Sequence, residues 1–240
     1  MPPKQDGHVG RALGLRRWVL WPGLGVLAVL GIVAAVARGV AVATGGSTFA
    51  WIRSSLPLWM ISDTDIVEAW FADAAWLTLV HVTAGCVFLA LAPFQFSTGI
   101  RQRYPRIHRI TGRIALIAAI PTVASGLLFA ALSPFGGVAA DAAIYLFGTI
   151  FVVALWRAYA AIRRGDITTH REWMLRLISI GAGIATVRVV SIPLLVLTGR
   201  PPLELLAASF WIGLGVTYVA AELWIRWTRI PALRAVVVTG

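Results

Sequence analysis

Cysteine is almost absent from this chain of 240 residues, which has one such residue, Cys86. A single cysteine cannot form an intramolecular disulfide, and it cannot build a cysteine-based metal cluster. Because Cys86 lies inside an apolar run, we predict that it is a small packing residue.

Charged residues are also scarce. They make up 13% of the chain, whereas soluble globular proteins have about 25%. No polar stretch is long enough to supply a second core, so we predict one domain. The sequence also lacks the protein-kinase, P-loop, HExxH and GxSxG signatures, and it therefore gives no support to those enzyme classes.

Apolar residues, in contrast, form 59% of the chain. Several apolar runs exceed ~18 residues, which is the length that a helix needs to cross a bilayer. The sequence therefore predicts an all-α fold, a polytopic membrane helical bundle with six transmembrane helices. The expected helices cover about 18–37, 63–96, 110–132, 138–161, 170–197 and 203–227.

The polar ends of the chain are expected to lie outside the membrane. Prolines and glycines in residues 1–17 predict an irregular, basic tail, and residues 229–240 predict a second basic tail. Residues 18–228 then form the membrane domain. Residues 39–62 are expected to follow the membrane surface, and Pro105 predicts a loop over 97–113.

The net charge of +11 could suggest binding to nucleic acid. However, the arginines fall between apolar runs and no nucleic-acid-binding motif surrounds them, so we expect no nucleic-acid partner. Fifteen of the 21 basic residues lie in the stretches 1–17, 97–113, 162–171 and 226–240, and Arg38, Arg53 and Arg200 fall on the opposite side. The positive-inside rule then predicts that both termini are cytoplasmic.

His81 lies inside the apolar run 74–96. Polar side chains at such a depth are rare and costly, which makes an intramembrane histidine a candidate site residue. Gly85 follows one turn later on the same face and would leave room for a flat ligand or a close helix. The alternative is a neutral histidine that only forms a hydrogen bond to a neighbouring helix.

His108 and His170 each open an expected helix, and an arginine follows each directly. Two such histidines on facing helices could bind haem b or a transition metal, while the arginines could bind propionates or a quinone. The alternative is that these side chains meet lipid phosphates. The candidate cofactor-binding residues are His81, His108, His170, Arg109, Arg113, Arg171 and Arg176, and the three histidines are also the candidate metal ligands.

The spacing of the histidines limits this site. From His81 to the expected helix end at Phe96 is a rise of ~22 Å, whereas a metal needs all its nitrogen ligands about 2 Å away. We therefore expect a layered arrangement, with His108 and His170 on the inner side and His81 further out, rather than one ion held by all three.

Several charged residues fall within expected helices. Arg188 lies near the middle of the fifth helix, and Asp141 and Glu204 are candidates to neutralise it across the bundle. Glu222, late in the sixth helix, is a candidate partner for Arg157. These charges could line a path through the membrane or form structural ion pairs.

Three motifs occur in order along the chain: HVTAGCVFLALAPFQF, HRITGR and HREWMLR. Together they resemble a bacterial family of predicted membrane proteins, domain of unknown function 2306, over about residues 75–195. The matching residues are His81, Gly85, Pro93 to Phe96, His108, Arg109, Gly112, Arg113, His170, Arg171, Trp173, Met174 and Arg176. This chain has Ala92 where the family more often has glycine, and Ile114-Ala115 where an aromatic residue often follows. The resemblance implies a multi-pass protein of the bacterial cytoplasmic membrane.

The family has no assigned reaction, so three functions remain open. The first is binding of haem or a metal for electron transfer or redox-enzyme assembly, with the bilayer and a membrane redox partner as partners. The histidine layout is similar to that of two-haem transmembrane cytochromes, although three helical histidines rather than four argue against a second haem. The other two functions are a small-molecule or proton-coupled transporter, and a structural membrane protein without chemistry.

Overall fold

The computed structural model describes residues 6–46, 64–132 and 136–239, and within these ranges the chain forms helices and no strand. The helices are α1 (Asp6–Thr44), α4 (Thr64–Asp73), α5 (Ala75–Phe96), α6 (Thr98–Arg103), α7 (Pro105–Leu132), α8 (Gly137–Arg163), α9 (Ile167–Thr198) and α10 (Pro202–Thr239). The predicted all-α class is confirmed.

Within the described residues, six helical segments are long and apolar enough to cross a membrane. They are Gly23–Thr44, Ala75–Phe96, Pro105–Leu132, Gly137–Arg163, Ile167–Thr198 and Pro202–Arg229. The prediction of six membrane-spanning helices is therefore confirmed.

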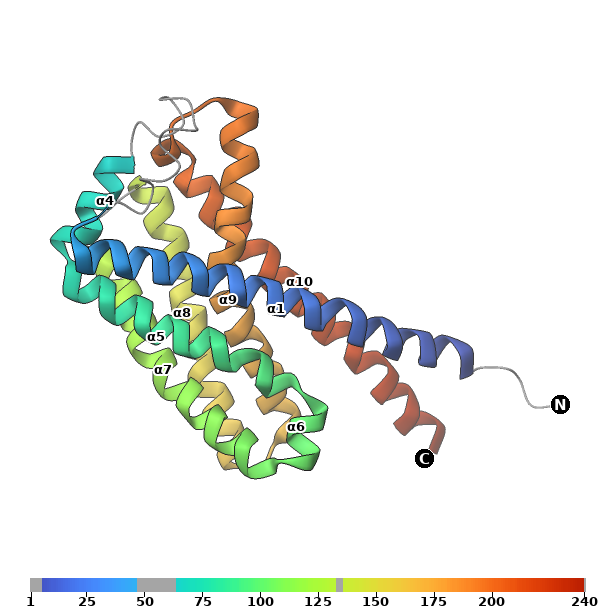
Figure 1. Cartoon of the computed structure of the whole chain (residues 1–240). Helices are drawn as coiled ribbons and strands as arrows, with labels where there is room; N and C mark the ends of the chain where they lie inside the picture. The colour runs from blue at the N-terminus through green and yellow to red at the C-terminus, as the bar shows by residue number, and fades with distance from the viewer. Residues whose placement is uncertain (1–5, 47–63, 133–135, 240) are drawn as a thin grey trace.

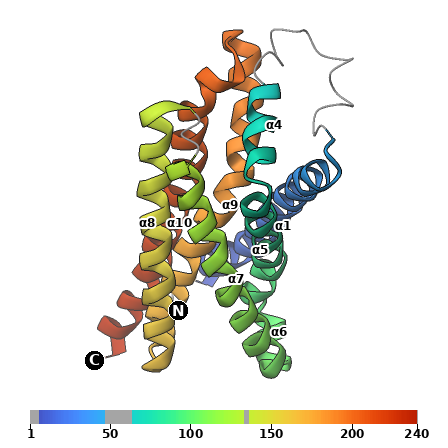
Figure 2. The ribbon, with the colours of Figure 1, turned by 90° about the vertical axis from the view of Figure 1, so that its left-hand side faces the viewer.

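The helices pack as neighbours in a bundle that α1 crosses obliquely (Figure 1). The closest pairs are α9 with α10, α5 with α7, α1 with α5, and α8 with α9. In Figure 1 the N-terminal part of α1 and the C-terminal part of α10 project sideways from the bundle, and Figures 1 and 2 both show α6 at the lower end of the bundle. This end, together with the α8–α9 turn, is called the basic end below.

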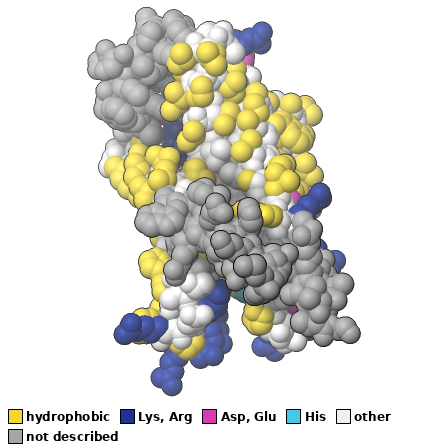
Figure 3. Space-filling view, turned by 90° about the vertical axis from the view of Figure 1, so that its right-hand side faces the viewer, with side chains coloured by type: hydrophobic (Ala, Val, Ile, Leu, Met, Phe, Trp, Pro, Cys, Tyr) yellow, Lys and Arg dark blue, Asp and Glu magenta, His cyan; other side chains and the backbone are white. Residues whose placement is uncertain are grey.

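The core is built from small and aromatic side chains. Ala119, Ala140, Ala143 and several other alanines are fully buried, and the Phe88 and Phe151 rings pack edge to face at 5.7 Å. Small residues let helix backbones approach closely, which favours helix association in lipid. Large apolar side chains instead cover much of the outer surface (Figure 3), as lipid contact requires.

The predicted helix over 63–96 is wrong, because the structure divides it into α4 and α5. Ala74, with φ −109° and ψ 46°, leaves the helical conformation between them. The Thr78 hydroxyl donates to the carbonyl oxygen of Phe71 at 2.9 Å and joins the two helices across the break. No glycine or proline marks this position, so the sequence pattern gave no signal for it.

The predicted loop over 97–113 is also wrong, because it holds α6 and the first two turns of α7. Ser97 caps α6 by accepting a hydrogen bond from the backbone N–H of Ile100 at 3.2 Å. Pro105 is the first residue of α7, where a missing N–H costs nothing. It separates the two helices without preventing either.

The ends of several helices also differ from the prediction. Helix α1 begins at Asp6, within the stretch predicted as an irregular tail, and includes the first residues of the predicted surface segment 39–62. Residues 47–62 of that segment lie outside the described residues. Helix α10 continues through the predicted tail to Thr239.

Candidate functional site

The three sequence motifs meet at the basic end. Gln95, near the end of α5, donates a hydrogen bond from Nε2 to Thr111 Oγ1 of α7 at 2.9 Å. A Cβ atom on Gly112 would lie 2.9 Å from Gln95 Oε1, so this glycine leaves room for the amide. The PFQF motif is thereby fixed to the HRITGR motif.

Arginine side chains surround this region. Arg101, Arg103, Arg106, Arg109 and Arg113 are exposed on α6 and α7, and Arg163, Arg164 and Arg171 are exposed at the ends of α8 and α9. Figure 3 shows Lys and Arg side chains gathered on this end, where an open notch separates two lobes. The basic end therefore presents a surface suited to anionic groups.

His108 on α7 and His170 on α9 lie within electrostatic range of each other, and Arg101 and Arg109 lie within the same range of His108. His170 donates from Nδ1 to the carbonyl oxygen of Ala158 at 2.8 Å. Since a carbonyl oxygen only accepts, the proton lies on Nδ1, and Nε2 carries a lone pair in the neutral ring. His108 Nδ1 is buried and has no hydrogen-bond partner in the part of the chain that the structure describes.

His81 lies apart from this pair. Its Nδ1 donates to the carbonyl oxygen of Thr122 at 3.0 Å and approaches Ser125 Oγ at 3.1 Å, which joins α5 to α7. A Cβ atom on Gly126 would lie 3.2 Å from His81 Cε1, so the ring packs directly against the α7 backbone. Within the described ranges, no three His, Cys, Asp or Glu residues form a group that could hold one metal ion.

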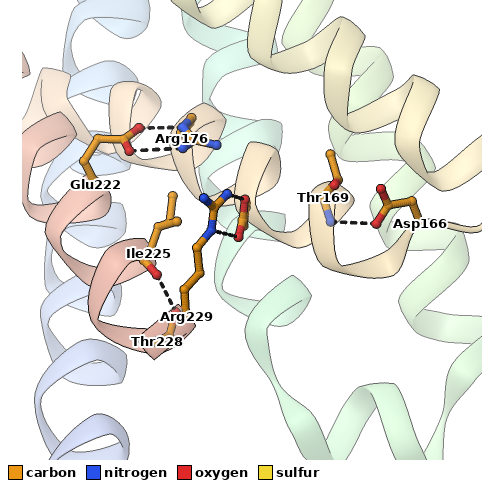
Figure 4. Close-up of polar contacts among 8 residues, drawn as sticks. Asp166, Thr169, Arg176, Glu222, Ile225, Thr228 and Arg229 are labelled. Carbon is orange, nitrogen blue, oxygen red and sulfur yellow. Dashed lines mark hydrogen bonds and ion pairs between the residues drawn. The ribbon is translucent and has the colours of Figure 1, made fainter. Parts of the chain in front are cut away.

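The HREWMLR motif connects α9 to α10 by ion pairs (Figure 4). Arg176 donates to Glu222 from Nε at 2.5 Å and from Nη2 at 3.0 Å, and Arg229 pairs with Glu172. The guanidinium of Arg176 also lies 4.5 Å from the centre of the Trp173 ring. Glu222 was expected to pair with Arg157, but its partner is Arg176, since α10 brings it to that side of α9.

Asp166 caps the start of α9. Its Oδ1 accepts the backbone N–H of Thr169 at 3.0 Å (Figure 4). Hydrogen bonds from the Thr169 side chain and backbone hold the pKa of the exposed Asp166 carboxyl below its ordinary value. This cap fixes where α9, and hence His170, begins.

Arg188 pairs with neither of its two expected partners. Its Nη1 donates to the carbonyl oxygen of Ile184 at 3.1 Å, one turn earlier on the same helix. Glu204 lies 3.9 Å from Arg200, its neighbour on the exposed α9–α10 turn. Asp141 keeps a buried Oδ1 without a partner among the described residues.

Some residues that shape the site were not predicted. Thr122, Ser125 and Ala158 fix the two histidine rings, although each belongs to an apolar helix and contributes mainly a backbone or hydroxyl oxygen. The pair Pro121 and Ser125 was a usable signal, because Ser125 donates to the carbonyl oxygen of Pro121. The role of Ala158 had no signal, since any residue carries a carbonyl.

Fold and site together define a multi-pass helical membrane protein with a polar, histidine-containing basic end. The family model described as "Predicted membrane protein (DUF2306)" matches residues 78–225, and the chain belongs to this family. A search of curated proteins and a search of solved structures each return no match to the chain.

Proposed function

We propose that this membrane protein binds haem b at the basic end, through His108 and His170, and transfers electrons within the membrane. The observation that carries the proposal is the buried Nδ1 of His108, which has no partner among the described residues. A buried polar atom without a partner is costly, and a ligand that engages the ring would remove that cost.

The state of His170 supports the same role. A hydrogen bond from the other ring nitrogen to a backbone carbonyl orients a metal-ligating histidine and selects its tautomer. His170 has this hydrogen bond with Ala158, and its Nε2 would be the ligating atom.

The donor set favours haem over a bare transition metal. A metal site built from side chains alone needs three or four ligands, and the described residues offer no such group. Haem needs only axial ligands from the protein, and bundles build such sites from facing helices. The bound group would accept and release one electron.

The arginines around the two histidines have a matching task. Arg109 and Arg113 are exposed on α7, and Arg171 is exposed on α9 beside His170. Guanidinium groups bind carboxylates by paired, charge-assisted hydrogen bonds, so these residues would hold the propionates. Arg176 has a different task, because Glu222 already neutralises it.

An absorption spectrum of protein purified from haem-sufficient cells tests the proposal. We expect a Soret band and about one haem per chain, and loss of both in His108→Ala and in His170→Ala. Thr149→Ala, at an exposed site on α8, is a control that keeps the band. A folded wild-type protein without haem would contradict the proposal and would favour a structural role for both histidines.

A further inference from the structure

A shallow groove runs along the outer surface of α8, next to the basic end. Its volume is about 480 Å³, and it is lined by Val152, Val153, Trp156, Arg157, Ala160 and Arg164. All six residues belong to α8 or to its C-terminal cap, so the groove is a feature of one helix face. Because α8 is one of the six spanning segments, this face meets lipid.

The lining of the groove changes from apolar to cationic along the helix axis. Val153 lies ten residues, or about 15 Å of rise, before α8 ends at Arg163. Arg157 lies only about 9 Å before that end, and Arg164 caps the helix. A membrane phospholipid has the same order, because its acyl chains lie deep in the bilayer and its phosphate lies at the surface.

An aromatic pair marks the level between these two parts. The Trp156 and Tyr159 rings are exposed, and their centres lie 6.5 Å apart. Exposed tryptophan and tyrosine side chains favour the interface between the hydrocarbon core and the headgroups. The arginines of the groove, which lie beside this pair and beyond it, are therefore at headgroup level.

Trp173 of α9 holds one of these arginines at the groove. The guanidinium carbon of Arg157 lies 5.9 Å from the centre of the Trp173 ring. A cation is attracted to the face of an aromatic ring without using its N–H groups as hydrogen-bond donors to an oxygen. The guanidinium is thus positioned by the ring and can still donate to a phosphate.

Neither groove arginine forms an ion pair with a carboxylate of the described residues. Glu222, the expected partner of Arg157, binds Arg176 instead. The charge of Arg164 acts on the exposed carboxyl of Asp166, which already caps α9. The groove therefore presents positive charge, and guanidinium groups form paired, charge-assisted hydrogen bonds with phosphate oxygens.

We propose that Arg157 and Arg164 bind the headgroup phosphate of an anionic phospholipid, with an acyl chain along Val152 and Val153. Both arginines line the same groove, so a headgroup that occupies it lies beside both guanidinium groups. The aromatic pair and the apolar lining favour a lipid over a soluble anion. The site does not use the histidines of the basic end, so it holds whether or not haem binds there.

The test uses the full-length protein in nanodiscs of equal amounts of phosphatidylglycerol and phosphatidylcholine, followed by native mass spectrometry of the lipid that remains bound. We expect wild-type protein to retain phosphatidylglycerol in preference to phosphatidylcholine. Arg157→Gln and Arg164→Gln should each lower this preference about fivefold, which is the effect expected of one basic residue near an anionic surface. Both side chains are exposed, so the variants should fold.

Arg163→Gln is the matched control, because this arginine is exposed on the same helix next to Arg164 but does not line the groove. It should leave the preference unchanged. An equal loss in Arg163→Gln and Arg164→Gln would overturn the proposal, since it would mean that only the overall charge matters. Equal retention of both lipids by the wild-type protein would overturn it without any variant. Displacement of the lipid by millimolar inorganic phosphate would also overturn it and would assign the groove to a soluble anion.

Discussion

Arg176 and Glu222, which are 46 residues apart in the chain, form a two-pronged ion pair that joins α9 to α10. The side chains are only 12% and 23% exposed. Such a pair contributes to stability mainly because each partner, once buried, is costly without the other.

Glu222→Gln should therefore destabilise the protein by about 2 kcal/mol, since it leaves the Arg176 guanidinium without a charged partner. Thermal unfolding in detergent measures this change. Glu204→Gln breaks an exposed pair of the same residue types and should change stability by less than about 0.5 kcal/mol. Equal effects of the two substitutions would contradict the role given to Arg176 and Glu222.

Substitution of two glycines on α10 by alanine should have opposite effects on stability. A Cβ atom on Gly213 would lie 2.6 Å from the backbone of Val187, so Gly213→Ala must separate α9 from α10 and should cost about 3 kcal/mol. Gly215 has nothing within 4 Å, and Gly215→Ala should stabilise the helix by up to about 1 kcal/mol. Unfolding midpoints of both variants in one detergent compare them, and a neutral Gly213→Ala would be the contrary result.

The effects of substitutions at His81 and at Gly126 on stability should depend on each other. His81→Ala removes the hydrogen bonds to α7 and leaves a cavity, with an expected loss of about 3 kcal/mol. Gly126→Ala should destabilise the wild type, because its methyl meets the His81 ring, but should stabilise the His81→Ala variant by filling the space. A double-mutant cycle on thermal stability measures this coupling, and additive effects would count against the direct packing. Haem content should stay unchanged in all three variants.

The capping hydrogen bond of Asp166 at the start of α9 predicts that the stability of the protein depends on pH. Because folding lowers the pKa of Asp166, its contribution to stability is fully present above the ordinary pKa of 3.8 and is lost as the pH falls through the lower folded value. Asp166→Asn keeps a capping oxygen that does not titrate. The difference in unfolding temperature between wild type and Asp166→Asn should therefore shrink between pH 5 and about pH 2. A constant difference over this range would show that the carboxylate is not the group responsible.

The excess of basic residues in the stretches 97–113 and 162–171 and near both chain ends predicts that these parts of the protein are cytoplasmic. Fluorescent-protein fusions at either terminus should then be bright in bacterial cells, and alkaline phosphatase fusions at the same positions should be inactive. The reverse pattern at either terminus would refute the predicted orientation.

The length of the apolar runs predicted the six spanning helices. In lipid the backbone N–H and C=O groups must form hydrogen bonds within each segment, which an α-helix achieves. The ends Phe96 and Leu132 were also predicted correctly, since a polar or turn-forming stretch follows each. The break at Ala74 was missed because tertiary contacts impose it and no residue type marks it. The extension of α10 to Thr239 was missed because basic composition was taken to mean an irregular tail.

The candidate site was predicted only in its residue types and rough depth. The sequence separated His81 from His108 and His170 because helical rise converts spacing into distance. It did not predict which side chains pair. Arg176 and Glu222 meet only because α9 packs on α10. His170 is held by a backbone carbonyl oxygen, which any residue at that position would supply. Whether the histidines ligate a cofactor remains a prediction.

The break at Ala74 also has a mechanical consequence for the surrounding lipid. It shortens α5 to 22 residues, or about 33 Å, whereas α9 has 32 residues, or about 48 Å. A helix longer than the hydrocarbon core adapts by tilting or by extending beyond it. Because a typical core is about 30 Å thick, α5 crosses it with little tilt, whereas α9 must tilt or extend into the headgroup region.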